Sequence, residues 1–386
     1  MMQNTDRMSA LYPWWRLSNI KGLGVISQNQ IFDLLPAQQF SQLYYQSDRQ
    51  ALREAGFKDK VLDALFSDDS SLDFGWSEAQ QWCEQDQCGL LFRGDDEYPE
   101  SLAALRDAPM FLFYAGDLTI LRNPGMAVVG SRNPSHYGRE QAHNLSAQLV
   151  ASDWNVISGL AIGIDGAAHL GALKDLTGLG CGHTIAVLGS GLNNIYPQRH
   201  VQLAHDIVYS GGLLLSEHKP DEKALARNFP RRNRIVSGLS KGVLVIEAAL
   251  KSGSLITARM AADQGREVFA LPGPVTNPQS RGCHQLIKEG AALIETVEDL
   301  LTVFGEELKP EMVRQEEQQT LPLDTGEQKL AESEIDILAA LDTVPVALDV
   351  LVARTGKDVA WLSQQLIFWE LKGKVSQVPG GYVRSS

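Results

Sequence analysis

Short apolar runs alternate with helical stretches through the middle of this chain, and this alternation most constrains its fold. The candidate strands are 90–92, 110–114, 126–129, 156–157, 184–188, 213–215, 243–246 and 268–271. Helical stretches such as 139–151 and 164–174 separate them. Short continuous apolar runs joined by helices are typical of parallel strands that are buried on both faces. The pattern predicts an α/β fold with a doubly wound, mainly parallel, Rossmann-like sheet, in which ligands bind beyond the carboxyl ends of the strands.

Glycine and serine gather at three of the predicted strand ends. The positions are Gly130 and Ser131 after 126–129, Ser158, Gly159 and Gly163 after 156–157, and Gly189 and Gly191 after 184–188. Their free amides and hydroxyls can hold phosphate oxygens, and Arg132 can add a bidentate contact. At any single turn, a tight strand-to-helix connection explains glycine better. Three such turns at one edge of a sheet favour an anion site.

A basic stretch occupies positions 227–241. Its cations, with no carboxylate among them, are Arg227, Arg231, Arg232, Arg234 and Lys241. After the predicted strand 243–246, Ser252, Gly253 and Ser254 open a helix whose first backbone amides form an anion site. These features predict a polyphosphate ligand, with the backbone of a nucleic acid favoured.

No cofactor fingerprint accompanies the glycines. The runs that begin at Gly130 and Gly189 lack the third glycine of the dinucleotide motif, and no ATPase-type phosphate loop occurs. The cysteines and histidines show no ligand spacing, so we expect neither a cofactor nor a metal. Asp165, His169 and Glu247 could form a general acid–base set, but a helix cap and a packing histidine explain Asp165 and His169 better.

Composition divides the chain into four parts. They are a small all-α domain (1–75), the α/β domain (76–305), an acidic linker (306–330) and a winged-helix domain of three helices and a hairpin (331–386). The stretch 17–24, LSNIKGLG, resembles the hairpin of a helix-hairpin-helix module, which contacts DNA phosphates without reading sequence. An ordinary helix connection is the alternative. The third helix of the last part has hardly any base, which favours a protein contact over duplex reading.

The net charge of −13 is unevenly distributed. Segments 68–100 and 306–336 contribute −9 and −7, which leaves about +3 for the rest of the chain. A basic surface is therefore compatible with an acidic protein. There is no apolar run of about 18 residues and no signal-peptide pattern at the N-terminus, so we expect a cytoplasmic protein without a membrane span.

Several motifs, in this order along the chain, resemble those of the DprA (Smf) family of DNA-processing proteins of bacterial transformation. The matching stretches are Gly130-Ser131-Arg132, Ser158-Gly159, Gly163-Ile164-Asp165 with Ala168-His169, Gly189-Ser190-Gly191 with Tyr196-Pro197, Asn228-Phe229-Pro230 through Arg234-Ile235, 252–258 and Pro272-Gly273. The chain departs from the usual pattern at His200, at His284 and over 217–220.

This resemblance implies an extended Rossmann fold, flanked by a sterile-alpha-motif-like N-terminus and a winged helix. It also implies a non-enzymatic homodimer that binds single-stranded DNA and loads the recombinase RecA. By the same resemblance Arg199, Asn233 and the basic run 231–234 contact the strand, with Gly130 to Arg132 and Ser252 to Ser254. Phe229 is either a stacking surface for bases or a core residue, and Tyr196 is the next stacking candidate.

The alternative is a nucleotide-binding or nucleotide-hydrolysing enzyme of the lysine-decarboxylase-like Rossmann group. That group carries a Pro-Gly-Gly-x-Gly-Thr-x-x-Glu run at a strand end, whereas this chain has AALKSGSL at 248–255. The sequence therefore favours a binding protein over this enzyme.

Overall fold

The computed structural model describes residues 4–174, 183–305, 341, 345–371 and 374–384. The chain forms two compact units, Met1–Val313 and Arg314–Ser386. The predicted acidic linker lies outside the described residues.

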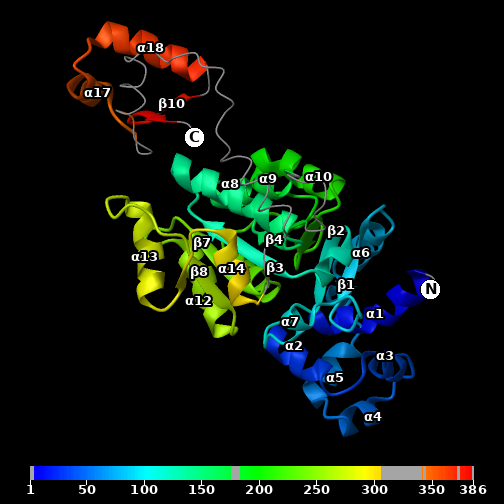
Figure 1. Cartoon of the computed structure of the whole chain (residues 1–386). Coiled ribbons are helices and arrows are strands. Elements are labelled where there is room, and N and C mark those ends of the chain that lie inside the picture. The colour runs from blue at the N-terminus through cyan, green and yellow to red at the C-terminus, as the bar shows by residue number, and fades with distance from the viewer. Residues whose placement is uncertain (1–3, 175–182, 306–340, 342–344, 372–373, 385–386) are drawn as a thin grey trace. The chain divides into compact units, whose positions relative to one another are not determined.

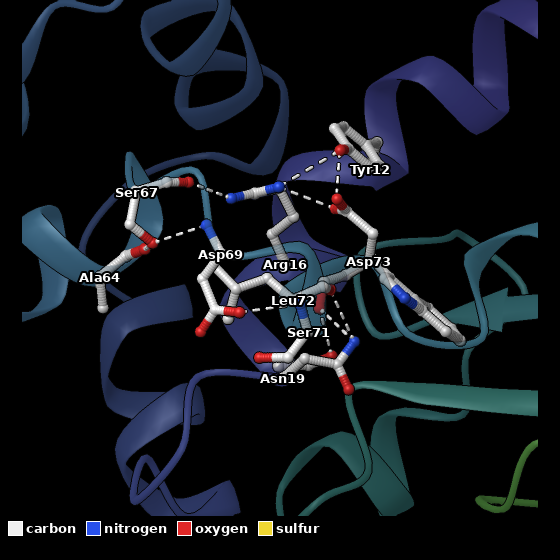
Figure 2. Close-up of polar contacts among 11 residues, drawn as sticks. Tyr12, Arg16, Asn19, Ala64, Ser67, Asp69, Ser71, Leu72 and Asp73 are labelled. Carbon is white, nitrogen blue, oxygen red and sulfur yellow. Dashed lines mark hydrogen bonds and ion pairs between the residues drawn. The ribbon is translucent and has the colours of Figure 1, made fainter.

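The first unit begins with helices, as predicted. They are α1 (Asn4–Ser18), α2 (Val25–Phe32), α3 (Ala37–Tyr45), α4 (Arg49–Glu54), α5 (Asp59–Leu65), the 3-10 turn η1 (Ser70–Asp73) and α6 (Trp76–Cys83). Figure 2 shows how buried Arg16 ties α1 to the segment between α5 and α6. Its guanidinium donates to the Asp73 carboxylate at 2.8 Å and to the Ser67 carbonyl at 2.7 Å. Asn19 Nδ2 donates to the Leu72 carbonyl at 3.1 Å, which fixes the turn between α1 and α2.

A nine-stranded sheet follows, in the order β1-β2-β6-β5-β4-β3-β7-β8-β9. The strands are β1 (Cys88–Phe92), β2 (Phe111–Gly116), β3 (Gly125–Gly130), β4 (Asn155–Ser158), β5 (Thr184–Leu188), β6 (Leu213–Ser216), β7 (Gly242–Ile246), β8 (Glu267–Ala270) and β9 (Ala292–Leu293). All pairings from β6 to β9 are parallel, and β1–β2 and β2–β6 are antiparallel. The predicted mainly parallel, doubly wound sheet is confirmed. Its strand order reverses direction between β3 and β7, the place where such sheets bind ligands.

Helices cover both faces of this sheet (Figure 1). They are α7 (Glu100–Ala103), α8 (His136–Ala151), α9 (Ile164–Ala172), α10 (Val201–Tyr209), α11 (Asn228–Gly238), α12 (Gly253–Asp263), α13 (Arg281–Lys288) and α14 (Val297–Val303), with the 3-10 turns η2 (Leu118–Arg122), η3 (Gln198–His200) and η4 (Pro278–Ser280). Within β3, Ala127 and Val129 pack with residues of α11, α12 and α13, whereas Met126 and Val128 pack with α8, α9 and α14. Side chains on a strand alternate between its faces, so β3 is apolar throughout because both faces are buried.

The second unit contains α17 (Leu348–Thr355), α18 (Val359–Leu371) and an antiparallel hairpin of β10 (Val375–Val378) and β11 (Gly381–Arg384). Leu351, Leu362, Leu366 and Trp369 form its core. These elements match the second and third helices and the hairpin of the predicted winged helix. Most of the first predicted helix, around 335–341, lies outside the described residues.

Candidate nucleic-acid-binding cleft

A cleft of about 800 Å³ opens beyond the carboxyl ends of β3 and β7, at the reversal of the strand order. Four stretches contribute most of its lining: 129–133 after β3, 224–233 including the start of α11, 249–257 at the start of α12, and Ala161 with Asp165 near the start of α9. Of the described residues that line it, Arg132, Arg232 and Lys251 are cations, and Asp165 is the single carboxylate. The cleft therefore has the charge that an anionic ligand requires.

The loop after β3 forms one wall. Gly130 is required there, because a Cβ at this position would collide with the Ile246 carbonyl of β7 and with Ile164. The Ser131 carbonyl accepts from the Ile164 amide at 3.1 Å, and Ser131 Oγ accepts from the Asn133 amide at 3.1 Å. Arg132 is exposed, and the ion pairs among the described residues do not include it. Its guanidinium is therefore available to a ligand.

A buried carboxylate fixes the shape of this loop. Glu247, directly after β7, is 5% exposed and has a φ of 52°, an unusual conformation for a residue other than glycine. Its carboxylate accepts from Ser135 N at 2.7 Å, Ser135 Oγ at 2.6 Å and Asn277 Nδ2 at 3.0 Å. A Cβ at Gly138 would meet this carboxylate. Glu247 thus connects the loop that follows β3 to the segment that follows β8.

The first turn of α12 forms the opposite wall. Ser252 is its N-cap, and its hydroxyl accepts from Ser254 N at 3.3 Å and lies 2.6 Å from Ser254 Oγ. Lys251 and Gly253 are exposed beside it. The amides of a first helical turn and the positive end of the helix dipole favour an anion at this position.

Arg232 of α11 closes the back of the cleft. It is 4% exposed, and its guanidinium donates to the carbonyls of Gly159, at 2.7 Å, and Val187. Burial lowers the pKa of Arg232 to about 10, and the nearby Asp165 carboxylate opposes this shift. Asp165 accepts from the Gly159 and Ala161 amides at 3.1 and 3.3 Å, and burial raises its pKa against the effect of Arg232. Arg232 and Asp165 together hold the strand ends of β4 and β5.

Two aromatic rings lie at the edge of the cleft. Tyr196 is 52% exposed and Phe229 is half-buried, and their centroids are 5.5 Å apart with the planes inclined at 52°. A Cβ at Gly189 would press against the Phe229 ring. The lack of a side chain at Gly189 therefore leaves room for the Phe229 ring.

The structure brings some of the expected site residues to the cleft and places others elsewhere. Those that line it are Gly130, Ser131, Arg132, Arg232, Asn233, Ser252, Gly253 and Ser254. Those that do not are Ser158, Gly159, Gly163, Gly189, Gly191, Arg199, Arg231, Arg234 and Lys241. Ser158, Gly159 and Gly163 lie behind its wall, where Gly163, with a φ of 88°, packs against the Ser131 carbonyl. The Gly191 amide donates to the Glu222 carbonyl at 2.8 Å, and Arg199 is exposed on η3.

The basic stretch is divided because most of it forms α11. Successive residues of a helix point about 100° apart, so neighbouring arginines leave the helix in different directions. Arg234 is buried against Glu217 at 2.7 Å and Asp107 at 3.1 Å, and Arg231 pairs with Glu217 at 3.4 Å. Lys241 precedes β7 and so lies at the amino ends of the strands, away from the cleft.

Sequence reasoning missed Lys251 as a site residue and Glu247 as the support of the loop. Lys251 directly precedes the Ser252 turn and could have been found by its charge beside a helix N-terminus. The partners of Glu247 are 112 and 30 residues away, so no local signal indicates its role.

Asp165, His169 and Glu247, considered above as an acid–base set, each bind different structural partners. Asp165 and Glu247 bind backbone and loop groups, and His169 is fully buried with its Nδ1 2.7 Å from Thr184 Oγ1. Among the described residues no three His, Cys, Asp or Glu side chains gather as a metal site. None of the described helices is long and apolar enough to cross a membrane.

His169 should make the fold sensitive to acid. Burial lowers its pKa to about 3, whereas an imidazole in the unfolded chain titrates near 6.5. Between these values the unfolded chain binds a proton that the folded protein excludes, so stability should fall as the pH drops below about 6.5. His169→Asn should reduce this loss, measured as the change in urea midpoint between about pH 7 and about pH 5. The same midpoint change in the wild type and in His169→Asn would contradict this role. The two proteins must be compared because the raised pKa of Asp165 makes stability rise, rather than fall, as the pH drops.

Family models and curated relatives that are similar to this chain all describe DprA or Smf proteins. A family model described as DNA recombination-mediator protein A matches residues 89–305, and one described as the DprA winged helix domain matches residues 322–381. Protein Smf of Escherichia coli K12 is 46% identical over 305 residues, covering 78% of this chain and 79% of that protein. Protein Smf of Synechocystis is 35% identical, covering 95% and 96% of the two chains.

Two solved structures are similar in fold and sequence. The X-ray structure of DNA processing protein A from Streptococcus pneumoniae is 37% identical with a TM-score of 0.60, covering 75% of this chain and 96% of that one. A structure of DNA processing protein A from Helicobacter pylori, described for its single-stranded DNA binding mode, is 30% identical with a TM-score of 0.50, covering 56% and 95%.

Proposed function

Because this chain belongs to the DprA/Smf family of DNA-processing proteins, we propose that it binds single-stranded DNA in the cleft beyond β3 and β7. One observation carries the proposal: the exposed Arg132 and the first turn of α12 line the same cleft at the reversal of the strand order. The single-stranded DNA binding mode described for the Helicobacter pylori protein supports the choice of ligand.

The cleft suits a phosphate backbone better than a base sequence. Arg132 and Lys251 supply positive charge. The Ser252 turn supplies amide and hydroxyl groups that can donate hydrogen bonds to the oxygens of any phosphate. Tyr196 and Phe229 offer ring surface to unstacked bases, which duplex DNA would not present. We therefore expect a preference for single strands over duplex and little sequence preference.

We also propose that the protein is not an enzyme. The best acid–base candidates in the sheet domain, Asp165, His169 and Glu247, are buried among structural partners. Release of free base from nucleoside monophosphates would contradict this and favour the nucleotide-hydrolysing alternative.

Family membership supports three finer proposals. The protein would act as a homodimer, in the cytoplasm, protecting incoming strands and loading RecA during natural transformation and recombination. Sedimentation of the purified protein tests the dimer. RecA-dependent strand exchange on protein-coated DNA, with and without residues 327–386, tests the loading and any part of the winged helix in it.

The affinity for single-stranded DNA should fall steeply with salt. Each phosphate neutralised on a single strand contributes about −0.7 to the slope of log K against log salt. With the two exposed cations of the cleft, Arg132 and Lys251, engaged, a slope of about −1.4 is expected. Fluorescence anisotropy with a labelled oligonucleotide over a salt series measures it, with duplex of the same sequence as the control. A slope near zero, or equal affinity for both forms, would argue against a phosphate-binding cleft.

A further inference from the structure

A second hollow, of about 720 Å³, adjoins the cleft at Tyr196. It is lined by the loop that follows β5, by the side of α10 that carries His205, and by Lys223 and Ala224. Tyr196 and Ala224 line both the cleft and the second hollow, so the two share a border. A strand that leaves the cleft past the Tyr196 ring would therefore enter the second hollow directly.

Hydrogen bonds between two loops hold the walls of the second hollow in place. Asn193 Nδ2 donates to the Asp221 carboxylate at 2.8 Å, and Asn194 Nδ2 donates to the Asp221 carbonyl, also at 2.8 Å. The Asn193 amide donates to the Pro220 carbonyl at 2.9 Å. Gly191 allows this close approach, because a Cβ there would collide with the Pro220 carbonyl. Gly191 does not line the cleft, but it shapes the hollow beside it.

The charge of the second hollow suits a phosphate. Of the described residues that line it, Lys223 is a cation and none is a carboxylate. Lys223 and His205 are both exposed, and the ion pairs among the described residues include neither of them. The Lys223 ammonium can therefore bind a phosphate, and a ring N–H of His205 can donate to it.

The carboxylates next to these two residues in the sequence are bound to other side chains. Asp206 accepts from Gln202 Nε2 at 2.8 Å, and a Glu222 oxygen lies 2.9 Å from His218 Nδ1. Neither carboxylate lines the second hollow. The positive charge of Lys223 is therefore left for a ligand.

The other lining residues suit an unstacked base. Leu192, Ile195 and Val201 supply apolar surface, and Tyr196, which is 52% exposed, supplies an aromatic ring. Gln198 is exposed and presents a side-chain amide, which can both donate to and accept from a base edge. Bases of a single strand can use such a surface, whereas bases stacked in a duplex cannot.

We propose that the single strand bound in the cleft continues past Tyr196 into the second hollow, which binds at least one further nucleotide. Lys223 and His205 contact a phosphate of this nucleotide, and its base lies on the apolar surface beside Gln198. The inference rests on the proposed function, because it extends the same strand beyond the cleft. The site for the strand is then longer than the cleft alone.

Lys223→Ala tests the proposal with oligothymidines of about 4 to about 16 nucleotides, the usual range of single-strand site sizes. The shortest should bind the variant like the wild type, because the cleft alone accommodates them. The longest should bind about fivefold or more weakly at about 50 mM salt, because one phosphate contact is lost. The slope of log affinity against log salt should become shallower by about 0.7 with the long oligonucleotides only. Anisotropy titrations measure both quantities.

Lys60→Ala is the matched control for this experiment. Lys60 is an exposed cation on α5 and lines neither the cleft nor the second hollow. Its replacement removes the same charge and should leave the affinity unchanged at every length.

Photocrosslinking tests the same point with the unmodified protein. Trypsin cleavage after Arg199 and Lys223 releases residues 200–223, which include His205 but no residue that lines the cleft. A long oligonucleotide that carries 4-thiothymidine should label this peptide as well as peptides from the cleft.

The proposal is overturned if Lys223→Ala matches the wild type at every length or loses the same affinity at every length, and equally if no crosslink maps to residues 200–223. Salt-dependent binding of oligonucleotides by the wild type would in those cases leave the proposed function intact. Absence of any oligonucleotide binding by the wild type would instead refute the proposed function itself.

Discussion

Replacing Arg132 with alanine should weaken single-stranded DNA binding by about ten- to a hundredfold at low salt, the usual effect of losing a charge-assisted hydrogen bond. Arg132 is exposed, lines the cleft and lies in the loop that Glu247 fixes. The slope of log affinity against log salt should also become shallower by about 0.7, because one phosphate contact is lost. Anisotropy titrations over a salt series measure both quantities.

Lys241→Ala is the matched control for this experiment. Lys241 is also exposed and cationic, but it lies at the amino ends of the strands. Its replacement removes the same net charge from the protein and should change neither the affinity nor the slope. If Arg132→Ala behaves like Lys241→Ala, the strand does not bind in the cleft.

Replacing Arg232 with methionine should destabilise the sheet domain by about 3–5 kcal/mol, because the buried carbonyls of Gly159 and Val187 each lose their donor at about 1–3 kcal/mol apiece. The guanidinium donates hydrogen bonds to the Gly159 and Val187 carbonyls. Its positive charge also lowers the pKa of Asp165 and so favours the charged carboxylate. Methionine fills similar space but leaves the carbonyls and the carboxylate without compensation. For a domain of this size we expect a drop in Tm of about 6 °C or more by calorimetry.

The neighbouring Arg231 provides the control. Its side chain is 56% exposed and its ion pair with Glu217 is long, at 3.4 Å, so Arg231→Met should alter the Tm little. Adding Asp165→Asn to Arg232→Met should recover part of the lost stability, because it removes the uncompensated charge. Equal Tm values for Arg231→Met and Arg232→Met would show that burial of Arg232 does not stabilise the fold.

Most of the fold could be predicted because its signals are local. A strand buried on both faces is a short apolar run, so all eight predicted strands are present. The missed strand, β9 (Ala292–Leu293), has two residues, too few for a periodic signal. Strand order depends on pairings between distant segments, so the position of the reversal between β3 and β7 could not be read from the sequence.

The candidate site was only partly predictable, because a run of charged residues in a sequence does not show which way each side chain points. Gly130 to Arg132 and Ser252 to Ser254 follow adjacent strands and meet as expected. The arginines of α11 diverge around the helix, and the acidic partners of Arg234, Glu217 and Asp107, come from distant segments. A count of local charges therefore overestimated how many cations face the cleft.

The cleft also has a consequence for the order of events during synthesis. Its walls come from segments between Val129 and Gln279, and the carboxylate that shapes the first wall is held by Asn277. A ribosome-bound chain cannot grip DNA until nearly the whole sheet domain has left the exit tunnel, because a domain folds as a unit once its contacts are available. Nascent chains stalled before Gln279 should therefore not bind single-stranded DNA. Binding should begin once the segment up to Gln279 has left the exit tunnel.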